Sequence, residues 1–374
     1  MAAKLTNISL SGFKTFRELK DFELRPINVL IGANSSGKSN FISFFRMLAN
    51  MLDRSQGLQL HVGKYGGASA FLHDGPLRTK HIEVRISMES GGGTNDYCFR
   101  LSLASGDVFM FADEQYSFTK YGMRPWPLRT LGAGHKEPNL NEIAEKETGP
   151  PRALRGILRT IVVHQFHNTS FESPLRRRCD RNDARFLKED GGNLAGFLLK
   201  LRDSEKENDR AAYQMILDTT RLLIPSFEDY VLEPEGEYVL LRWREKGCDQ
   251  EFHSGQASDG MLRLMALIAL LRQPDDTLPE VLFIDEPELG LHPHAITVVA
   301  ELMRGLSHRT QLIVATQSPA LVDEFEPEDV VVVQRRERES TLERMNKEEL
   351  REWLKEYSLG ELWRKNVLGG GPFA

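Results

Sequence analysis

Short apolar runs alternate with amphipathic segments along the chain, and this alternation predicts an α/β fold. Three runs are apolar almost throughout, as expected of strands buried on both faces of a sheet: residues 27–31, 281–284 and 312–315. A helical pattern follows the first run, with apolar side chains at i, i+3, i+4 and i+7: Phe41, Phe44, Phe45 and Leu48. Residues 260–272 are apolar almost all round and predict a buried helix.

Other segments have different periods. In residues 81–103, apolar and polar positions alternate on both sides of Gly91–Gly93, which predicts an antiparallel hairpin with one exposed face. Residues 131–152 are polar and rich in Gly, Glu and Pro, and predict a loop. Residues 347–365 form a last amphipathic stretch, and Gly369–Gly371 predict the start of a loose tail.

Composition narrows the class of protein. The 374 residues are 40% hydrophobic and 27% charged, as in an ordinary globular protein, and the net charge of −6 leaves nucleic-acid contact to local basic patches. No apolar run reaches the ~18 residues that a membrane span needs. The first ten residues lack a signal-peptide core, and three scattered cysteines form no CxxC pair. We therefore expect a cytoplasmic protein without a membrane partner.

A phosphate-binding pattern lies between the first buried strand and its helix. Residues 32–39 fit GxxxxGK(S/T) at every fixed position, and we call them the phosphate loop. Glycines let the N–H groups turn inward around phosphates, Lys38 can reach the outer phosphates, and the Ser39 hydroxyl can bind Mg²⁺. The alternative is a Gly/Ser turn with a chance lysine, which the strand and helix context disfavours. The expected nucleotide-binding residues are Gly32, Asn34, Ser35, Ser36, Gly37, Lys38, Ser39 and Asn40.

Two carboxylates end the second buried strand. Asp285 is placed to hold Mg²⁺, directly or through water, and Glu286 can orient or deprotonate a water molecule. Strand ends also carry solvated acids, but the upstream phosphate loop favours the catalytic interpretation. No NKxD-type sequence follows the phosphate loop, which disfavours a GTPase.

The order of motifs resembles that of ABC-type ATPases of the SMC/RecF/OLD group. Ser258–Gly260 opens the apolar helix ahead of Asp285, as the serine–glycine signature does in that group. Residues 11–16 (SGFKTF) resemble the opening of the group, and residues 285–293 (DEPELGLHP) resemble its Walker B strand end and D-loop. Alone, Ser258–Gly260 would also serve as a helix N-cap.

The resemblance implies the fold of a P-loop NTPase: an ABC-type ATPase head with a mixed central sheet, an antiparallel β subdomain and a helical lobe. It implies ATP and Mg²⁺ as ligands and ATP hydrolysis with Glu286 as a catalytic residue. It further implies an ATP-bridged homodimer, in which Ser258, Asp259 and Gly260 of one subunit meet the γ-phosphate held by the other.

In this interpretation residues 1–374 form a single head. The expected parts are a first lobe at about 1–165 with a strand at 237–253, a helical lobe at about 166–236, a signature and Walker B part at 254–334, and a C-terminal helical tail at 335–374.

Two glutamines have roles that the resemblance suggests. Gln317 follows the third buried strand, where family members often carry a histidine that senses the γ-phosphate. Its amide can hydrogen-bond a phosphate oxygen or the attacking water but cannot carry charge, so slow turnover is expected. Gln165 is a candidate Q-loop residue that binds Mg²⁺, and equally a polar residue at a strand end. For His164 and His167 no further metal ligand is evident, and we expect structural roles.

Several partners remain open at this point. Residues 39–258 show no heptads, which excludes a cohesin-like rod, and too few residues follow Gln334 for the nuclease domain of OLD proteins. The expected function is a RecF/OLD-like ATPase that dimerises on ATP and signals to DNA or to a separate effector, such as a nuclease or toxin, in DNA repair or antiviral defence. The alternatives are a nucleotide-gated scaffold with little hydrolysis and a transporter subunit. The arginines at 176–185 and 335–338 fit DNA contact and solvated ion pairs equally well.

Overall fold

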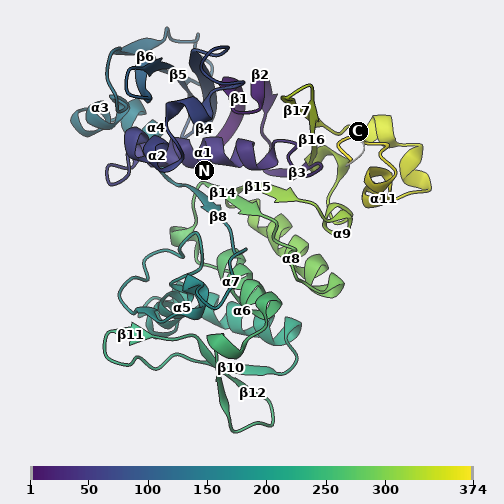
Figure 1. Cartoon of the computed structure of the whole chain (residues 1–374). Coiled ribbons are helices and arrows are strands. Elements are labelled where there is room, and N and C mark those ends of the chain that lie inside the picture. The colour runs from purple at the N-terminus through teal and green to yellow at the C-terminus, as the bar shows by residue number, and fades with distance from the viewer. Residues whose placement is uncertain (1–2, 372–374) are drawn as a thin grey trace. The chain divides into compact units, whose positions relative to one another are not determined.

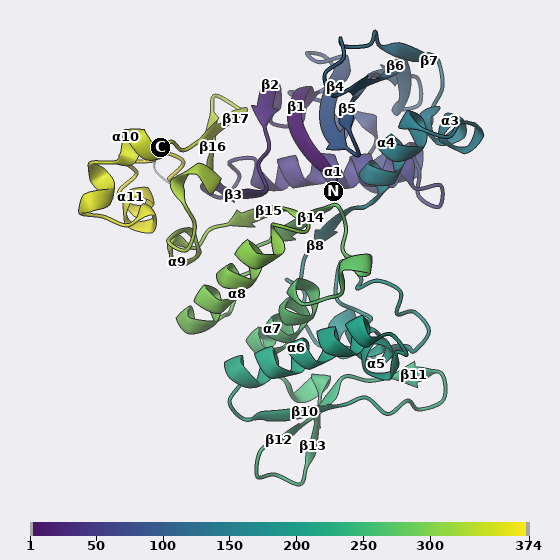
Figure 2. The same ribbon diagram turned by 180° about the vertical axis from the view of Figure 1, so that it is seen from behind.

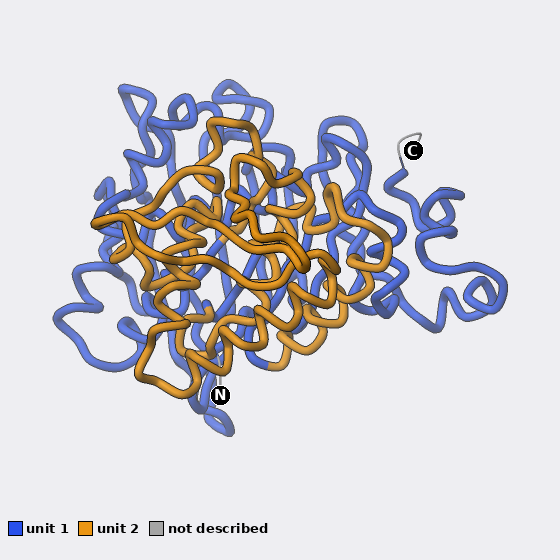
Figure 3. Tube along the Cα trace, turned by 90° about the horizontal axis from the view of Figure 1, so that it is seen from below, with its two compact units in different colours: residues 1–162, 279–283, 309–374 blue, residues 163–278, 284–308 orange. Residues whose placement is uncertain are grey.

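The computed structural model describes residues 3–371, which divide into two compact units (Figure 3). Unit 1 combines the chain up to residue 162 with residues 279–283 and the chain from residue 309 onward. Unit 2 consists of residues 163–278 and 284–308. Within residues 3–371, no helix has the length and apolarity needed to cross a lipid bilayer.

Unit 1 contains an antiparallel sheet in the order β2-β1-β4-β5-β6-β7. Its strands are β1 (Lys4–Phe13), β2 (Phe16–Glu23), β4 (His81–Ser90), β5 (Gly93–Ala104), β6 (Val108–Lys120) and β7 (Arg129–Gly132). Buried side chains alternate with exposed ones along β4 and mostly with half-buried ones along β5, because one face of the sheet packs against the core. The hairpin expected at residues 81–103 is confirmed.

A second sheet has the order β17-β16-β3-β15-β14-β8. Its strands are β3 (Ile27–Ile31), β8 (Ile161–His164), β14 (Val281–Asp285), β15 (Gln311–Thr316), β16 (Val330–Arg336) and β17 (Glu339–Arg344). β3 pairs in parallel with β15 and β16, whereas β17 pairs antiparallel with β16, so this sheet is mixed. Every residue of β3 and β15 is buried, as their apolar sequences predict.

The helix α1 (Lys38–Leu52) lies between the two sheets in both views of the chain (Figures 1 and 2). Its aromatic face is fully buried: Phe41 packs on Phe16, Phe44 on Phe13, and Phe45 on Phe283 at ring distances of 4.7–6.0 Å. This packing fixes the start of α1 at the end of β3. The other helices of unit 1 are α2 (Leu58–Lys64), α3 (Leu140–Lys146), α4 (Pro150–Arg159), α9 (Pro319–Val322), α10 (Lys347–Leu350) and α11 (Leu359–Arg364).

The loop expected at residues 131–152 is wrong, because α3 and the start of α4 lie within it. The buried carboxylate of Glu114 accepts hydrogen bonds from the backbone N–H groups of Asn139 (2.8 Å) and Leu140 (3.1 Å) at the start of α3. Glu114 therefore caps a polar helix from a distant strand, which local composition cannot reveal. Pro150 occupies the first turn of α4, a position where its missing N–H has no cost.

The α-helices of unit 2 are α5 (Leu194–Asp203), α6 (Glu207–Leu223), α7 (Asp259–Leu271) and α8 (Pro293–Leu306). It also has a small sheet in the order β10-β12-β13 and a β11-β9 pair. Their bounds are β9 (Cys179–Asp180), β10 (Phe227–Val231), β11 (Tyr238–Val239), β12 (Arg242–Glu245) and β13 (Glu251–His253). Residues 237–253 were expected to form a strand of the first lobe. They instead pair with strands of unit 2, where Trp243 of β12 is buried.

Candidate functional site

The phosphate loop joins β3 to α1, as its sequence context predicts. Its backbone turns through positive φ at Gly32 (155°), Ser35 (64°) and Gly37 (123°). A Cβ on Gly32 would lie 2.3 Å from the Val333 carbonyl oxygen, and one on Gly37 would lie 2.4 Å from the Ser340 hydroxyl, so only glycine fits at either position. The loop leads into the N-terminus of α1, where first-turn N–H groups have no partner in the helix and favour an anion.

The side chains of the loop and of α1 take up defined positions. Lys38 is buried, and its ammonium donates hydrogen bonds to the carbonyl oxygens of Gly32 (2.5 Å) and Ala33 (3.1 Å). Asn40 donates to the Thr15 hydroxyl (3.0 Å), which ties α1 to the SGFKTF segment. The positive charge of Lys38 thus lies on the inner side of the loop, where its backbone would surround a phosphate.

The last part of unit 1 braces the phosphate loop from outside. Two side chains donate to backbone carbonyl oxygens of the loop: the Arg335 guanidinium to Ser35 (3.5 Å) and the Ser340 hydroxyl to Ser36 (2.6 Å). In the third hydrogen bond, the Ala33 N–H of the loop donates to the Gly370 carbonyl oxygen (2.7 Å). Residues 33–36, 333–336 and 370–371 line a cavity of about 240 Å³. The expectation of a loose tail at Gly369–Gly371 is therefore wrong, because the tail is bonded to the loop.

Replacing Gly370 by alanine is expected to weaken ATP binding. Gly370 has φ +66°, and a Cβ there would lie 2.7 Å from the Val332 side chain, so alanine should push the tail away from Ala33. The expected loss is about tenfold in ATP affinity, corresponding to about 1.4 kcal/mol, measured by titration calorimetry. The matched control is Gly236→Ala, which has φ +65° with nothing within 4 Å of the added Cβ, and it should bind ATP normally. Equal affinities for both variants would show that the contact of Gly370 with Ala33 does not support ATP binding.

Unit 2 brings two of the candidate Mg²⁺-site residues together at the end of β14. The Gln165 amide donates a hydrogen bond of 2.7 Å to the Asp285 carboxylate. His167 Nε2 lies 3.0 Å from the Asp285 carbonyl oxygen and 3.8 Å from the Glu286 carboxylate, although the sequence predicts a structural role for it. Glu286 has φ +46°, so the chain turns sharply at this residue. Gln165 directly follows β8 and His167 lies two residues further on, and this spacing was the available signal that His167 accompanies Gln165.

The candidate signature lies at the start of α7. Ser258 is exposed, and its hydroxyl accepts a hydrogen bond from the Met261 N–H (3.2 Å) as the helix N-cap. A Cβ on Gly260 would lie 2.4 Å from the carbonyl oxygen of Gly290, so α7 approaches the D-loop segment closely only because residue 260 is glycine. Ser258 therefore caps α7 while its side chain stays accessible, and the two proposed uses of this serine are compatible.

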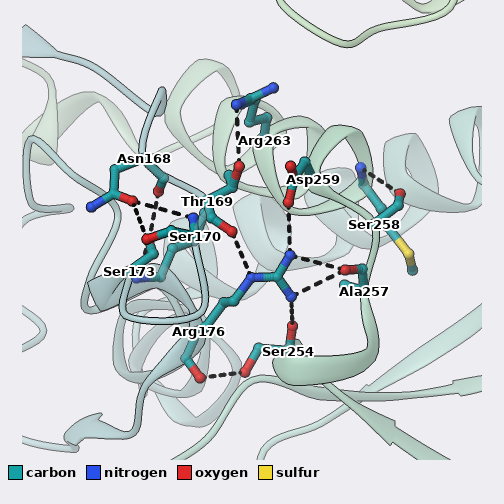
Figure 4. Close-up of polar contacts among 12 residues, drawn as sticks. Asn168, Thr169, Ser170, Ser173, Arg176, Ser254, Ala257, Ser258, Asp259 and Arg263 are labelled. Atoms are coloured by element: carbon teal, nitrogen blue, oxygen red, sulfur yellow. Dashed lines mark hydrogen bonds and ion pairs between the residues drawn. The ribbon is translucent and has the colours of Figure 1, made fainter.

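Two arginines hold this region together, a role that the sequence did not indicate for either of them (Figure 4). Arg176 donates to the carbonyl oxygens of Thr169 and Ala257 and to the Asp259 carboxylate, which lies 2.8 Å away. Its hydrogen bond holds the pKa of Asp259 below the usual range. Arg263 of α7 donates to the His167 carbonyl oxygen (2.9 Å) and the Thr169 hydroxyl (3.1 Å). The Arg176 side chain, which is only 10% exposed, is thus engaged within the chain and is not offered to a DNA backbone.

Gln317 lies in unit 1 directly after β15, and its side chain is exposed. The next residue, Ser318, caps the short α9 by accepting a hydrogen bond from the Leu321 N–H (3.3 Å). β15 and β3 are paired in parallel, so the end of β15 and the phosphate loop that follows β3 belong to the same unit.

Comparisons with known proteins agree on the class. The chain matches, over residues 27–323, the family described as "AAA domain, putative AbiEii toxin, Type IV TA system". No curated protein matches the sequence. Among solved structures, the chain is similar to the SmcHead bound to the C-winged helix domain of ScpA (TM-score 0.59, 17% identity, 93% of this chain and 99% of that chain covered).

A second solved structure points to the same fold. It is the Smc head domain with an extended coiled coil bound to the C-terminal domain of ScpA derived from Pyrococcus furiosus (TM-score 0.56, 16% identity, 95% of this chain and 99% of that chain covered). These likenesses confirm the expected P-loop ATPase fold. Since the family match spans most of the chain, the protein belongs to this AAA domain family, and its fold is similar to that of SMC heads.

Proposed function

We propose that this protein is a RecF/OLD-like ATPase in which ATP and Mg²⁺ join two copies of the chain. The observation that carries the proposal is the phosphate loop, with glycines that tolerate no side chain and a buried lysine on its inner side. Because the loop opens α1, its N–H groups and the helix terminus favour a triphosphate. The match to an AAA domain family supports ATP as the nucleotide.

Each residue has a proposed role in the reaction. Lys38 and the loop N–H groups bind and orient the β- and γ-phosphates. The Ser39 hydroxyl and the Asp285 carboxylate are oxygen donors of the kind that Mg²⁺ prefers, and Gln165 orients that carboxylate through its hydrogen bond. Bound Mg²⁺ supplies positive charge that offsets the charge of the phosphates. Glu286 takes a proton from the attacking water, and Gln317 hydrogen-bonds the water or a phosphate oxygen.

The second half of the site would come from another copy of the chain. Ser258 and Asp259 are exposed at the N-terminus of α7, where the Ser258 hydroxyl and the Gly260 N–H can meet an anion. A γ-phosphate held by the partner's phosphate loop supplies that anion. ATP then connects the two copies, and hydrolysis removes the connecting phosphate.

The variant Ser258→Asp tests this arrangement. Aspartate caps a helix as well as serine does, so α7 should persist, but its charge opposes a γ-phosphate. Since juxtaposed like charges cost several kcal/mol, ATP-dependent dimerisation should weaken about 100-fold or more. Light scattering of the eluting protein, with a nonhydrolysable ATP analogue present, measures the dimer.

The matched control is Ser358→Asp, which makes the same change at the N-cap of α11, where Ser358 accepts a hydrogen bond from the Glu361 N–H. This variant should dimerise like the unaltered protein. If Ser258→Asp dimerises as well as the control, Ser258 is only a helix cap and the two-copy site is wrong.

The output of the dimer is proposed to be a signal to another macromolecule. The family description names a putative toxin of a type IV toxin–antitoxin system, which favours antiviral defence over DNA repair. The two SMC heads were solved with ScpA domains bound, which supports a separate protein partner here, such as a nuclease or toxin. DNA contact would rest on the exposed arginines and should weaken steeply with salt.

A second candidate function is a nucleotide-gated scaffold that hydrolyses little ATP. Gln317 favours it, because a neutral amide stands where relatives often use a histidine. Steady-state phosphate release with and without DNA separates the two functions. Continuous turnover supports the ATPase, whereas ATP-dependent assembly without turnover supports the scaffold.

A further inference from the structure

Arg176 holds the segment that leads into α7, residues 254–259, which we call the signature loop (Figure 4). One of its guanidinium nitrogens donates to the carbonyl oxygens of Ser254 (2.6 Å) and Ala257 (3.1 Å). The other terminal nitrogen donates to the Ala257 carbonyl oxygen (3.1 Å) and the Asp259 carboxylate (2.8 Å). The Arg176 carbonyl oxygen accepts a hydrogen bond from the Ser254 hydroxyl (2.8 Å), so backbone and side chain hold the loop together.

The chemistry of this contact requires arginine. The side chain of Arg176 is only 10% exposed, and a charge buried to this extent is tolerated when its donors are all directed at acceptors. A guanidinium offers a planar set of donors that can reach two carbonyl oxygens and a carboxylate at once, whereas a lysine ammonium is a compact charge on a flexible stem. Ala257 and Ser258 are extended, after the 3₁₀ turn Ser254–Gln256. The arginine therefore determines how the chain enters α7.

The same arginine connects the signature loop with the end of β14. Its Nε donates to the Thr169 carbonyl oxygen (2.8 Å), and Thr169 belongs to the segment that contacts Asp285 through Gln165 and His167. Arg263 strengthens this path by binding the carbonyl oxygens of Phe166 (3.1 Å) and His167 (2.9 Å) from within α7. Hydrogen bonds at both ends of residues 165–169 thus connect the Asp285 carboxylate, through this segment, to the signature loop inside unit 2.

We propose that Arg176 is a positioning residue that sets the signature loop for contact with the nucleotide of a second copy, and that it ties this loop to the Asp285 side of the site. The proposal rests on the proposed function, in which Ser258 meets the partner's γ-phosphate. It assigns Arg176 a role in assembly, since its guanidinium donors are directed at acceptors of the chain itself. Removing the guanidinium leaves the carbonyl oxygens of Ser254 and Ala257 without this donor, so Ser258 loses its defined position.

The variant Arg176→Ala tests the proposal, with Arg177→Ala as the matched control. The side chain of Arg177 is 59% exposed, and its one ion pair among the described residues is with Glu172. With a nonhydrolysable ATP analogue, Arg176→Ala should dimerise about tenfold or more weakly than the control, while ATP binding to the monomer stays within about twofold, because the phosphate loop lies in the other unit.

Chemical rescue provides a readout that a general loss of structure would not give. Millimolar guanidinium, far below denaturing concentrations, should restore dimerisation of Arg176→Ala by filling the vacated position. If the alanine variant does not fold, Arg176→Lys keeps a buried charge and should show a partial loss that guanidinium does not change.

The outcomes separate this inference from the function on which it rests. If the unaltered protein stays monomeric with the analogue, the two-copy site itself is wrong. If the unaltered protein dimerises and Arg176→Ala dimerises equally well, the role of Arg176 is wrong. Loss of both dimerisation and ATP binding without rescue would also overturn it, since the arginine would then support the fold in general.

Discussion

Replacing Glu286 by glutamine is expected to lower kcat for ATP hydrolysis about 10²- to 10⁴-fold, the usual contribution of a general base. Glutamine keeps the shape of the side chain and can still hydrogen-bond water, but it cannot take up a proton. ATP should therefore bind normally and persist, and the protein should remain dimeric in ATP itself. Phosphate release measures the first effect, and light scattering of the eluting protein measures the second.

The surroundings of Glu286 sharpen this expectation. His167 Nε2 lies 3.8 Å from the Glu286 carboxylate and 3.0 Å from the Asp285 carbonyl oxygen. The contact with the Asp285 backbone does not involve the Glu286 carboxylate, so it should hold the turn at Glu286 in the variant as well. The control is Glu301→Gln on the exposed face of α8, which should keep full turnover. An unchanged kcat for Glu286→Gln would assign the base elsewhere, and a monomer in ATP would contradict assembly through nucleotide.

The parts of the site that were predictable are those with local causes. The apolar run at 27–31 is β3 in the structure, and the glycine pattern after it leads directly into α1. Both signals can be read from a short stretch of sequence. A continuous apolar run indicates a strand buried on both faces, and the glycines permit the backbone conformations that the loop needs. The approximate positions of β14 and β15 follow in the same way.

Other parts depend on partners that are distant in sequence. Arg176, Arg177 and Arg178 are one uniform run of charge, but their side chains are 10%, 59% and 64% exposed. The difference arises because carbonyl oxygens of residues 254 and 257 face only the first. The bond from Ala33 to Gly370 is likewise invisible in the sequence, since a glycine-rich end is typical of an unbound tail. Tertiary structure decides both cases.

The largest expected effect on binding comes from Lys38. Its ammonium is buried and is held by the carbonyl oxygens of Gly32 and Ala33, which places a full positive charge inside the phosphate loop. A charge-assisted hydrogen bond is worth about 1.5–3 kcal/mol, so each hydrogen bond to phosphate that Lys38→Ala removes should weaken ATP binding about 10- to 100-fold. The fold should survive, because α1 is held by its aromatic face rather than by this charge.

Thermal unfolding with and without ATP measures this effect on folded protein. A ligand present at 100 times its Kd stabilises a protein by about 2.7 kcal/mol, whereas a variant that binds 100-fold more weakly gains only about 0.4 kcal/mol at the same concentration. Lys64→Ala, which removes an exposed lysine from α2 of the same unit, should keep the full stabilisation by ATP. Equal stabilisation of both variants would show that nucleotide binds without the phosphate loop, and every role proposed for residues 32–40 would then fail together.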